Sequence, residues 1–456
     1  MRLPMVFSTT ISDQAIIHFD REASNLLTFL KPIPPKPRSP TPIGSQAHVP
    51  ISAHLTDNDI RSPINVSYRD WLGGFKGFEI HDGTIHETLS EEAVIGFERL
   101  VDTVVQHQNL PSFCSANYVR EHLINWIRQR RLGQPIEVSW VAALLKQLAH
   151  AVVEQCILVP VVGIQISDRF KLGRVEFDFF RESSIADMTR FIPEGTPILA
   201  EFRERMKKTY QGCVYAEYKC VAEKTHAEQS AIYHTEKALD LLRMFELAAQ
   251  DIRARSVLGR MGDVAPMQRH TFTVGSTGEL FLSDGLEREG CIDFILDSEL
   301  WSLLRNSQIY IANDLLQKDK LSDLEKNCLE ALSHFAHGIR SHAPQDRLLH
   351  AMVAVESLLL RDGNEPVQSK LGYRIALLTA RDLESRRRAQ RAFLDGYVLR
   401  SRFVHHGARP TEIETANQCL RLCWDTVGAV FKSSQHFTDK KALLDRLEDE
   451  ILSPRR

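Results

Sequence analysis

The chain has 456 residues, of which 43% are hydrophobic and 25% are charged, and its formal net charge is −3. This length predicts two or three domains, and the near-neutral charge excludes a polycation that binds nucleic acid over its whole surface. No apolar run is long enough to cross a bilayer, and the N-terminus lacks the pattern of a secretory signal, so we expect a cytoplasmic protein with no membrane partner.

The first 50 residues are predicted to form an N-terminal segment and a linker. Seven prolines lie between Lys31 and Pro50. Such a density is typical of an extended, polyproline-like chain, and we interpret this stretch as a connector.

Residues 51–312 are predicted to form a region of mixed helices and strands. Apolar residues at helical spacing predict helices near 90–107, 117–131, 140–153 and 222–250. Val175, Phe177 and Phe179 alternate with acidic residues, which is the pattern of a half-buried strand, and a hairpin is predicted within 270–282.

This α+β region contains no phosphate-binding loop, no dinucleotide fingerprint and no carboxylates at metal-ligand spacing. The eight cysteines of the chain form no CxxC pair, which favours reduced thiols over a disulfide framework or a zinc site. We therefore expect neither a metal nor a cofactor, and we interpret residues 51–312 as a sensing or regulatory module whose trigger is unknown.

The C-terminal part is predicted to be all-α, so the fold class of the whole chain is α+β. Ser322 and Glu325 form a capping box, which marks the first helix of a bundle within 313–436. We predict bundle helices at 322–337, 345–361, 367–380, 384–406 and 411–433. A charged helix follows in the C-terminal segment 437–456, and we expect it to pack on a partner subunit or to fold back.

The candidate site lies late in the fourth bundle helix, in the sequence YVLRSRFVHHG at 397–407. Gly407 predicts the helix end, and Thr411 with Glu414 predicts the capping box of the next helix. At about 100° per residue, one apolar stripe contains Phe393, Tyr397, Arg400 and Val404. The neighbouring stripe contains Leu394, Val398, Ser401 and His405. The opposite, solvent-facing wedge contains Arg388, Arg391, Asp395, Arg402 and His406.

A guanidinium among apolar residues needs a carboxylate, a phosphate or an open cleft, because it cannot lose its charge. Arg400 therefore indicates a site, with Tyr397 and His405 beside it. The simpler alternative is a surface arginine and a histidine that stabilises the C-terminal dipole of the helix.

The segment from Arg400 to His405 resembles a motif of the HEPN superfamily. That motif is an arginine followed by a small polar residue, three further residues and a histidine, and it lies late in an all-α domain. The sequence LRSRFVHHG, behind helices that read LLHAMVAVESLLL and KLGYRIALLTA, is similar to the Apea-like branch of this superfamily. The resemblance covers about residues 320–435. It implies a bundle of four or five helices and a dimeric, metal-independent RNase. In this resemblance Arg400 and His405 match the catalytic arginine and histidine, and Ser401 takes the polar position. His406 doubles the histidine, and the helix phase favours His405.

Two further charged residues lie on apolar helix faces of the predicted bundle. Glu356 shares a face with leucine, valine and methionine residues, and Arg374 shares a face with two leucines. We expect a buried Glu356–Arg374 ion pair that sets the helix register, although Glu356 could instead orient Arg400.

The same part of the chain has a local excess of positive charge. Residues 346–409 contain 12 Lys or Arg and 7 Asp or Glu. Such a domain suits a partner with phosphates, although a solvated helix face explains the charge equally well. The predicted RNA contacts are Arg386, Arg387, Arg388, Arg391 and Arg402.

These expectations combine into one functional hypothesis. RNA supplies its own nucleophile, the 2′-hydroxyl, so a histidine and an arginine can cleave it without a metal. We expect an endoribonuclease that acts on RNA, with tRNA as a candidate substrate, and that works as a homodimer. We expect it to serve as a toxin or antiviral defence effector under control of its N-terminal region. The alternatives are a non-catalytic HEPN module that binds RNA or nucleotide, and a helical dimerisation domain of a sensor.

Overall fold

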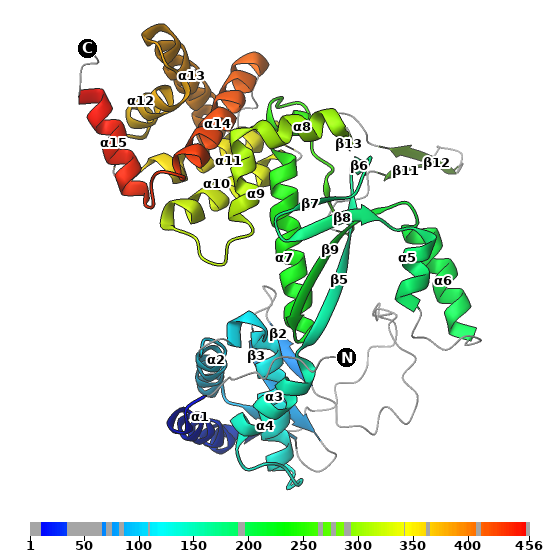
Figure 1. Cartoon of the computed structure of the whole chain (residues 1–456). Coiled ribbons are helices and arrows are strands. Elements are labelled where there is room, and N and C mark those ends of the chain that lie inside the picture. The colour runs from blue at the N-terminus through cyan, green and yellow to red at the C-terminus, as the bar shows by residue number, and fades with distance from the viewer. Residues whose placement is uncertain are drawn as a thin grey trace. The chain divides into compact units, whose positions relative to one another are not determined.

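The computed structural model describes residues 11–33, 66–69, 75–81, 86–107, 110–189, 197–262, 268–274, 280–286, 293–341, 343–361, 365–406 and 412–452 (Figure 1). The chain divides into two compact units. Unit 1 comprises Met1–Gln155 and Cys220–Gln229, and unit 2 comprises Cys156–Lys219 and Ser230–Arg456. Most of the predicted proline-rich connector lies outside the described residues.

Unit 1 packs four helices with a small antiparallel sheet. The helices are α1 (Asp13–Leu26), α2 (Glu91–Val105), α3 (Ala116–Arg131) and α4 (Trp140–Ala151). The sheet has the order β1-β4-β3-β2, with strands Leu30–Pro32, His86–Leu89, Phe75–His81 and Val66–Arg69. The predicted helices 90–107, 117–131 and 140–153 are confirmed, whereas α1 was not predicted.

The helix starts of unit 1 follow from local capping. The Ser115 and Ser139 hydroxyls accept hydrogen bonds from the backbone N–H groups of Tyr118 and Ala142, at the starts of α3 and α4. The apolar faces of these helices then bury Trp126 and Trp140 almost completely. This burial stabilises the packing of α3 and α4, since apolar area removed from water contributes about 25 cal/mol per Å².

Unit 2 contains a five-stranded sheet with the order β10-β5-β9-β8-β7. Its strands are Gly259–Arg260, Val153–Val162, Val214–Ala222, Val175–Phe179 and Phe170–Leu172. The predicted strand at 175–179 is confirmed as β8, whose residues Val175 and Phe177 are buried. The predicted hairpin is also confirmed, as β11 (Gln268–Val274) paired with β12 (Leu280–Leu286).

Further elements of unit 2 flank this sheet in the sequence. A parallel pair joins β6 (Ile164–Ile166) to β13 (Phe294–Leu296). The helices are α5 (Glu182–Thr189), α6 (Pro197–Tyr210) and α7 (Lys224–Arg243), the last of which begins in unit 1. The long helix predicted over 222–250 corresponds to α7, which ends earlier than expected, at Arg243.

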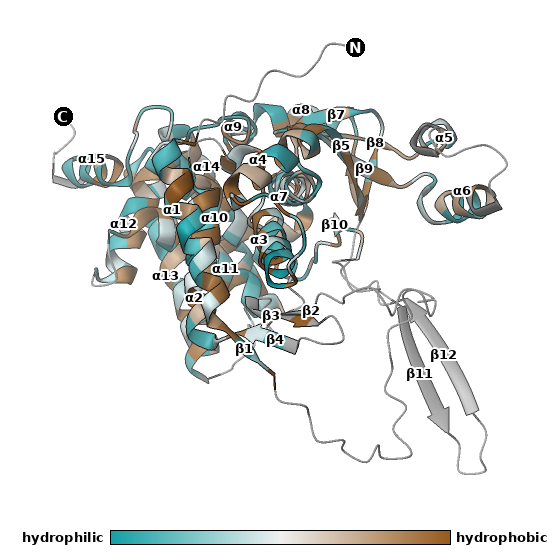
Figure 2. Ribbon diagram, turned by 90° about the horizontal axis from the view of Figure 1, so that it is seen from below, coloured by the Kyte–Doolittle hydropathy of each residue, from teal (hydrophilic) through white to brown (hydrophobic). Residues whose placement is uncertain are grey.

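The rest of unit 2 is helical. It comprises α8 (Ser298–Asn306), α9 (Ile311–Leu315), α10 (Asp323–Ile339), α11 (Pro344–Leu359), α12 (Val367–Thr379), α13 (Leu383–His406), α14 (Ile413–Ser433) and α15 (Lys440–Leu452). The helices predicted from 322 onward are all present, and the Ser322–Glu325 capping box is formed as expected. The helices have hydrophobic and hydrophilic sides (Figure 2). The chain is thus of mixed α+β class.

Helix α14 packs against α10, α11, α12 and α13 and so forms the centre of this helical part. Phe335, Phe393 and Phe431 are among its fully buried side chains. Within the described part of the chain, no helix has the length and apolarity needed to span a membrane.

Candidate functional site

Helix α13 carries Arg400 and His405 on its last two turns, and its buried side differs from the predicted one. Phe393, Gly396 and Leu399 face the interior, whereas Val404 is 47% exposed. The expected apolar stripe through Tyr397 and Val404 is therefore rotated.

The reason for this rotation is a close approach between α13 and α14. A Cβ atom built on Gly396 would lie 2.4 Å from the Sγ atom of Cys419. Only a residue without a side chain allows this approach, so Gly396 becomes the centre of the contact and turns the neighbouring residues accordingly. A glycine carries no hydrophobic signal, which is why the sequence pattern did not reveal it.

Arg400 lies at the edge of the buried side and is half-buried. Its Cζ atom is 5.5 Å from the centroid of the Tyr397 ring, a cation–π distance. Its Nε atom is buried without a hydrogen-bond partner. Arg400 makes no hydrogen bond or ion pair with any residue that the structure describes.

Two buried arginines of unit 2, Arg243 and Arg347, donate hydrogen bonds from all three guanidinium nitrogens. Arg243 donates to Glu236, Asp240 and the Leu258 carbonyl. Arg347 donates to the carbonyl oxygens of Ser341 and Ile252. Buried polar groups are normally satisfied in this way. The Nε atoms of Arg255 and Arg400 are buried without a hydrogen-bond partner, and Arg400 is the one of these two that lies on α13, five residues before His405. This makes Arg400 a candidate binding position.

Glu356 of α11 is the acidic group in electrostatic reach of Arg400. Burial raises the pKa of this carboxyl, and the positive charge of Arg400 opposes that rise. The structure shows no hydrogen bond or ion pair between the two side chains. Glu356 therefore biases the position of Arg400 without neutralising it.

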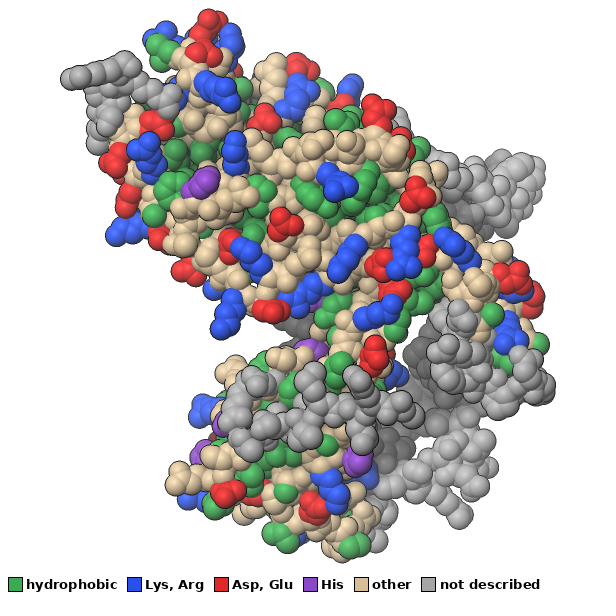
Figure 3. Space-filling model, in the orientation of Figure 1, with side chains coloured by type: hydrophobic (Ala, Val, Ile, Leu, Met, Phe, Trp, Pro, Cys, Tyr) green, Lys and Arg blue, Asp and Glu red, His purple; other side chains and the backbone are tan. Residues whose placement is uncertain are grey.

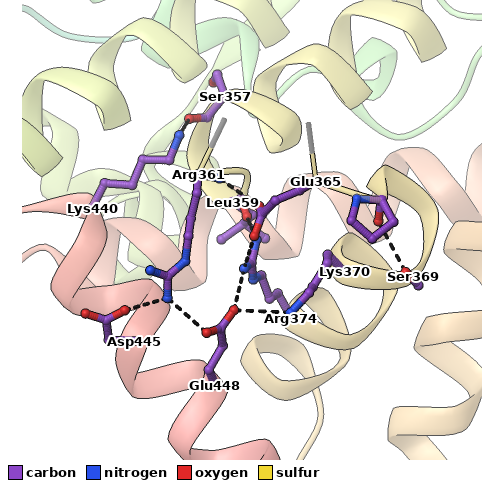
Figure 4. Close-up of polar contacts among 11 residues, drawn as sticks. Ser357, Leu359, Arg361, Glu365, Ser369, Lys370, Arg374, Lys440, Asp445 and Glu448 are labelled. Atoms are coloured by element: carbon purple, nitrogen blue, oxygen red, sulfur yellow. Dashed lines mark hydrogen bonds and ion pairs between the residues drawn. The ribbon is translucent and has the colours of Figure 1, made fainter. Parts of the chain in front are cut away.

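The expected Glu356–Arg374 ion pair is wrong. Arg374 is fully buried and donates to both carboxylate oxygens of Glu365, each at 2.8 Å, and to Glu448 at 2.9 Å (Figure 4). A further N–H of Arg374 donates to the Leu359 carbonyl oxygen at 2.5 Å. These hydrogen bonds hold the pKa of Glu365 at about 2. Arg374 thus has a structural role outside the candidate site.

Sequence reasoning missed both carboxylates of this cluster. Glu365 lies just before α12, and Glu448 lies on α15, 74 residues beyond Arg374. No helical periodicity connects such positions. Arg361 adds a 3.0 Å ion pair to Glu448, and Leu443, Leu444 and Leu447 are buried. The charged C-terminal helix therefore folds back on its own chain, one of the two predicted outcomes.

Three of the five predicted RNA-contacting arginines are tied to acidic neighbours. Arg386 pairs with Glu450 at 3.2 Å, Arg388 with Glu384 at 2.7 Å and Arg402 with Glu412 at 3.0 Å. Figure 3 shows basic and acidic side chains interspersed on the visible face of the molecule, with no large field of one sign.

The other two, Arg387 and Arg391, are exposed on α13. Neither makes a hydrogen bond or ion pair with any described residue. They are the cations available to an external phosphate.

His405 is exposed near the end of α13, whereas the helix phase had placed it among apolar residues. Its apolar neighbours Val398 and Val404 are themselves 43% and 47% exposed. Ser401 is half-buried between them. The side chain of His406 lies outside the described part, as do Gly407 and Thr411, so the predicted helix stop and capping box cannot be compared. Helix α14 begins at Ile413, after Glu412 at the N-cap.

The arrangement offers a cation, a nearby carboxylate and an accessible imidazole at one end of a helix. Among the described residues, no group of three or more histidine, cysteine, aspartate or glutamate side chains could hold a metal ion. Comparisons of the chain with protein-family models, with curated proteins and with solved structures find no match.

Proposed function

We propose that the chain is a metal-independent endoribonuclease of HEPN type, which works as a homodimer under the control of its N-terminal region. The observation that carries this proposal is the half-buried guanidinium of Arg400, which has no anionic partner in direct contact. Because arginine cannot neutralise itself by losing a proton, such a group is stabilised by binding an anion, and two phosphate oxygens match its planar fork.

The chemistry requires only the chain and its substrate. The 2′-oxygen of RNA attacks the adjacent phosphorus, and a base accepts the 2′-hydroxyl proton. The bond from phosphorus to the 5′-oxygen breaks, and an acid donates a proton to that leaving oxygen. The products are a 2′,3′-cyclic phosphate and a 5′-hydroxyl. His405 supplies the acid or base, and Arg400 stabilises the charge that develops on the phosphorane.

Glu356 and Tyr397 support this role of Arg400. The aromatic ring lies beside the guanidinium, and the carboxyl of α11 attracts it from within the bundle. A side chain held in this way loses less conformational freedom when it binds phosphate, which favours catalysis by preorganisation. We assign Glu356 and Tyr397 as positioning residues.

Helix geometry supports the homodimer. Arg400 and His405 are five residues apart, which corresponds to about 140° around the helix and about 7.5 Å along it. One copy of α13 therefore does not direct both side chains to the same phosphate. A second copy, related by a two-fold axis, supplies the missing group. The partly exposed Val398 and Val404 provide apolar area for the contact between copies.

The same geometry supports a path for RNA. Arg387 precedes His405 by eighteen residues, and because a turn contains about 3.6 residues, the two lie on one side of α13. Arg391 is within about 40° of that side by the same calculation. Both arginines are exposed and unpaired among the described residues, so the RNA backbone can follow this side of the helix toward His405.

The test is incubation of the purified chain with tRNA and with mRNA in the presence of a chelator, followed by mapping of the cut ends. We expect ends with a 2′,3′-cyclic phosphate from the wild type and none from Arg400→Ala or His405→Ala. If both variants cleave RNA as fast as the wild type does, the proposed site is refuted. RNA binding without cleavage would indicate a non-catalytic module, and a dimer that binds no RNA would indicate a dimerisation domain.

A further inference from the structure

In unit 1, a cavity of about 480 Å³ is lined by residues of α3, of α4 and of the segment between them, all within residues 122–150. Its volume is in the range of about 300 to 1,000 Å³ that is typical of small-molecule sites. None of the residues discussed for RNA cleavage lines it. The polar residues at this cavity include His122, Arg128, Glu137, Lys146, Gln147 and His150.

His122 is the most constrained of these residues. Its side chain is 9% exposed, and the Trp140 indole Nε1–H donates a 3.1 Å hydrogen bond to its Nδ1 atom. Trp140 is itself fully buried at the first position of α4, where the Ser139 cap holds the helix start. The imidazole is therefore locked between α3 and α4.

This hydrogen bond decides where the imidazole carries its proton. An indole nitrogen can only donate, so Nδ1 of His122 must be the acceptor and the ring hydrogen must be on Nε2. Burial lowers the pKa of His122 to about 4, so the ring stays neutral near physiological pH. His122 thus presents one N–H donor of fixed direction.

No residue in the described part of the chain accepts a hydrogen bond from Nε2 of His122, although this side chain lines the cavity. The side chain is nine-tenths buried, and its one N–H donor makes no contact with an acceptor among the described residues beside the cavity. This donor is therefore available to the acceptor atom of a ligand.

The lining indicates the chemical class of that ligand. Arg128 and Lys146 are cationic, and Gln147 and His150 add polar groups. The one carboxylate, Glu137, already forms a 2.9 Å ion pair with Lys146. This balance of donors over acceptors favours an acceptor-rich, negatively charged ligand. The indole of Trp126 also lines the cavity and offers a flat apolar surface.

We infer that this cavity binds a small organic anion, whose carboxylate or phosphate oxygen accepts the hydrogen bond from Nε2 of His122 and whose apolar part lies against Trp126. A ligand bound at this site is a chemical signal that the N-terminal region can sense. The inference is independent of RNA cleavage, because binding is measured directly.

The experiment is isothermal titration calorimetry of the full chain with phenylacetate, adenosine 5′-monophosphate, inorganic phosphate and adenosine. We expect saturable binding of phenylacetate or of the nucleotide, which separates a carboxylate ligand from a phosphate ligand. Inorganic phosphate lacks the apolar part and should bind more weakly, and neutral adenosine should not bind. Failure of both organic anions to bind at millimolar concentration would overturn the inference.

Two substitutions of His122 distinguish the loss of its hydrogen-bond donor from a general disturbance of the fold. The Oδ1 atom of asparagine occupies the place of Nδ1, so His122→Asn keeps an acceptor for Trp140 and removes the donor from the cavity. The amide nitrogen of glutamine occupies the place of Nε2, so His122→Gln keeps the donor. We expect His122→Asn to weaken binding by about tenfold to a hundredfold, and His122→Gln to retain most of the affinity. An unchanged affinity of a folded His122→Asn chain would overturn the inference.

A rim substitution provides a second test that does not disturb the interior. Lys146 has a side chain that is 70% exposed, so Lys146→Glu leaves the fold intact while it reverses a charge beside the cavity. We expect at least tenfold weaker binding of the anion. The matched control is Lys224→Glu, whose side chain is 79% exposed and does not line the cavity. Equal affinities of the two variants would contradict an anionic ligand.

Discussion

Glu246 provides a quantitative prediction about stability and pH. Its side chain is 8% exposed, and it accepts a 2.9 Å hydrogen bond from the Ser256 hydroxyl. Burial raises its pKa to about 7, against the opposing effects of the Ser256 hydrogen bond and the positive charge of Arg243. The folded state therefore binds a proton more tightly than the unfolded state, in which the carboxyl has its ordinary pKa of 4.5.

The sign follows from this difference. The stabilisation by the bound proton is fully present below the unfolded pKa and is lost as the pH rises through about 7. The difference between the pKa of 4.5 in the unfolded chain and about 7 in the folded protein corresponds to about 3 kcal/mol, of which about 2.5 kcal/mol is lost between about pH 5 and pH 8. Unit 2 should thus become less stable over this interval because of Glu246.

The assay is urea unfolding of the wild type and of Glu246→Gln at about pH 5 and about pH 8. Glutamine stays neutral and keeps an acceptor for Ser256, so its variant should lose about 2.5 kcal/mol less between the two conditions. The control is Glu299→Gln, at an exposed position of α8, which should behave as the wild type. An equal loss of stability in wild type and Glu246→Gln would refute the reasoning.

The remaining predictions concern α13 and its contacts. His406→Ala should keep most RNase activity while His405→Ala loses it, and the reverse result in an end-mapping assay would show that the register is wrong. Because Arg374 does not pair with Glu356, Glu356→Gln should leave the melting temperature unchanged and lower the cleavage rate by about tenfold; a lower melting temperature with full activity would contradict this. Gly396→Ala should destabilise by about 1–3 kcal/mol in urea unfolding. Cys419→Ala should not rescue it, because the Cβ atom of Cys419 is itself 2.5 Å from the added Cβ.

The amino-acid sequence determined the elements whose signals are local. The capping box at Ser322 and Glu325 involves residues three positions apart, and it starts α10 as predicted. The alternation around Phe177 likewise produced β8, because a strand shows its buried side every second residue. Arg400 was identifiable for the same reason, since a charge among apolar residues stands out within one helix.

Tertiary structure alone decided which face of α13 is buried and which partners the charges take. The contact of Gly396 with Cys419 turned the helix, and a glycine contributes nothing to a hydrophobic pattern. Glu448 reached Arg374 from a helix 74 residues away, and Trp140 set the tautomer of His122 from the neighbouring helix. These interactions depend on which surfaces meet after the chain has folded, because hydrogen bonds and close packing act over a few ångströms irrespective of separation in the sequence.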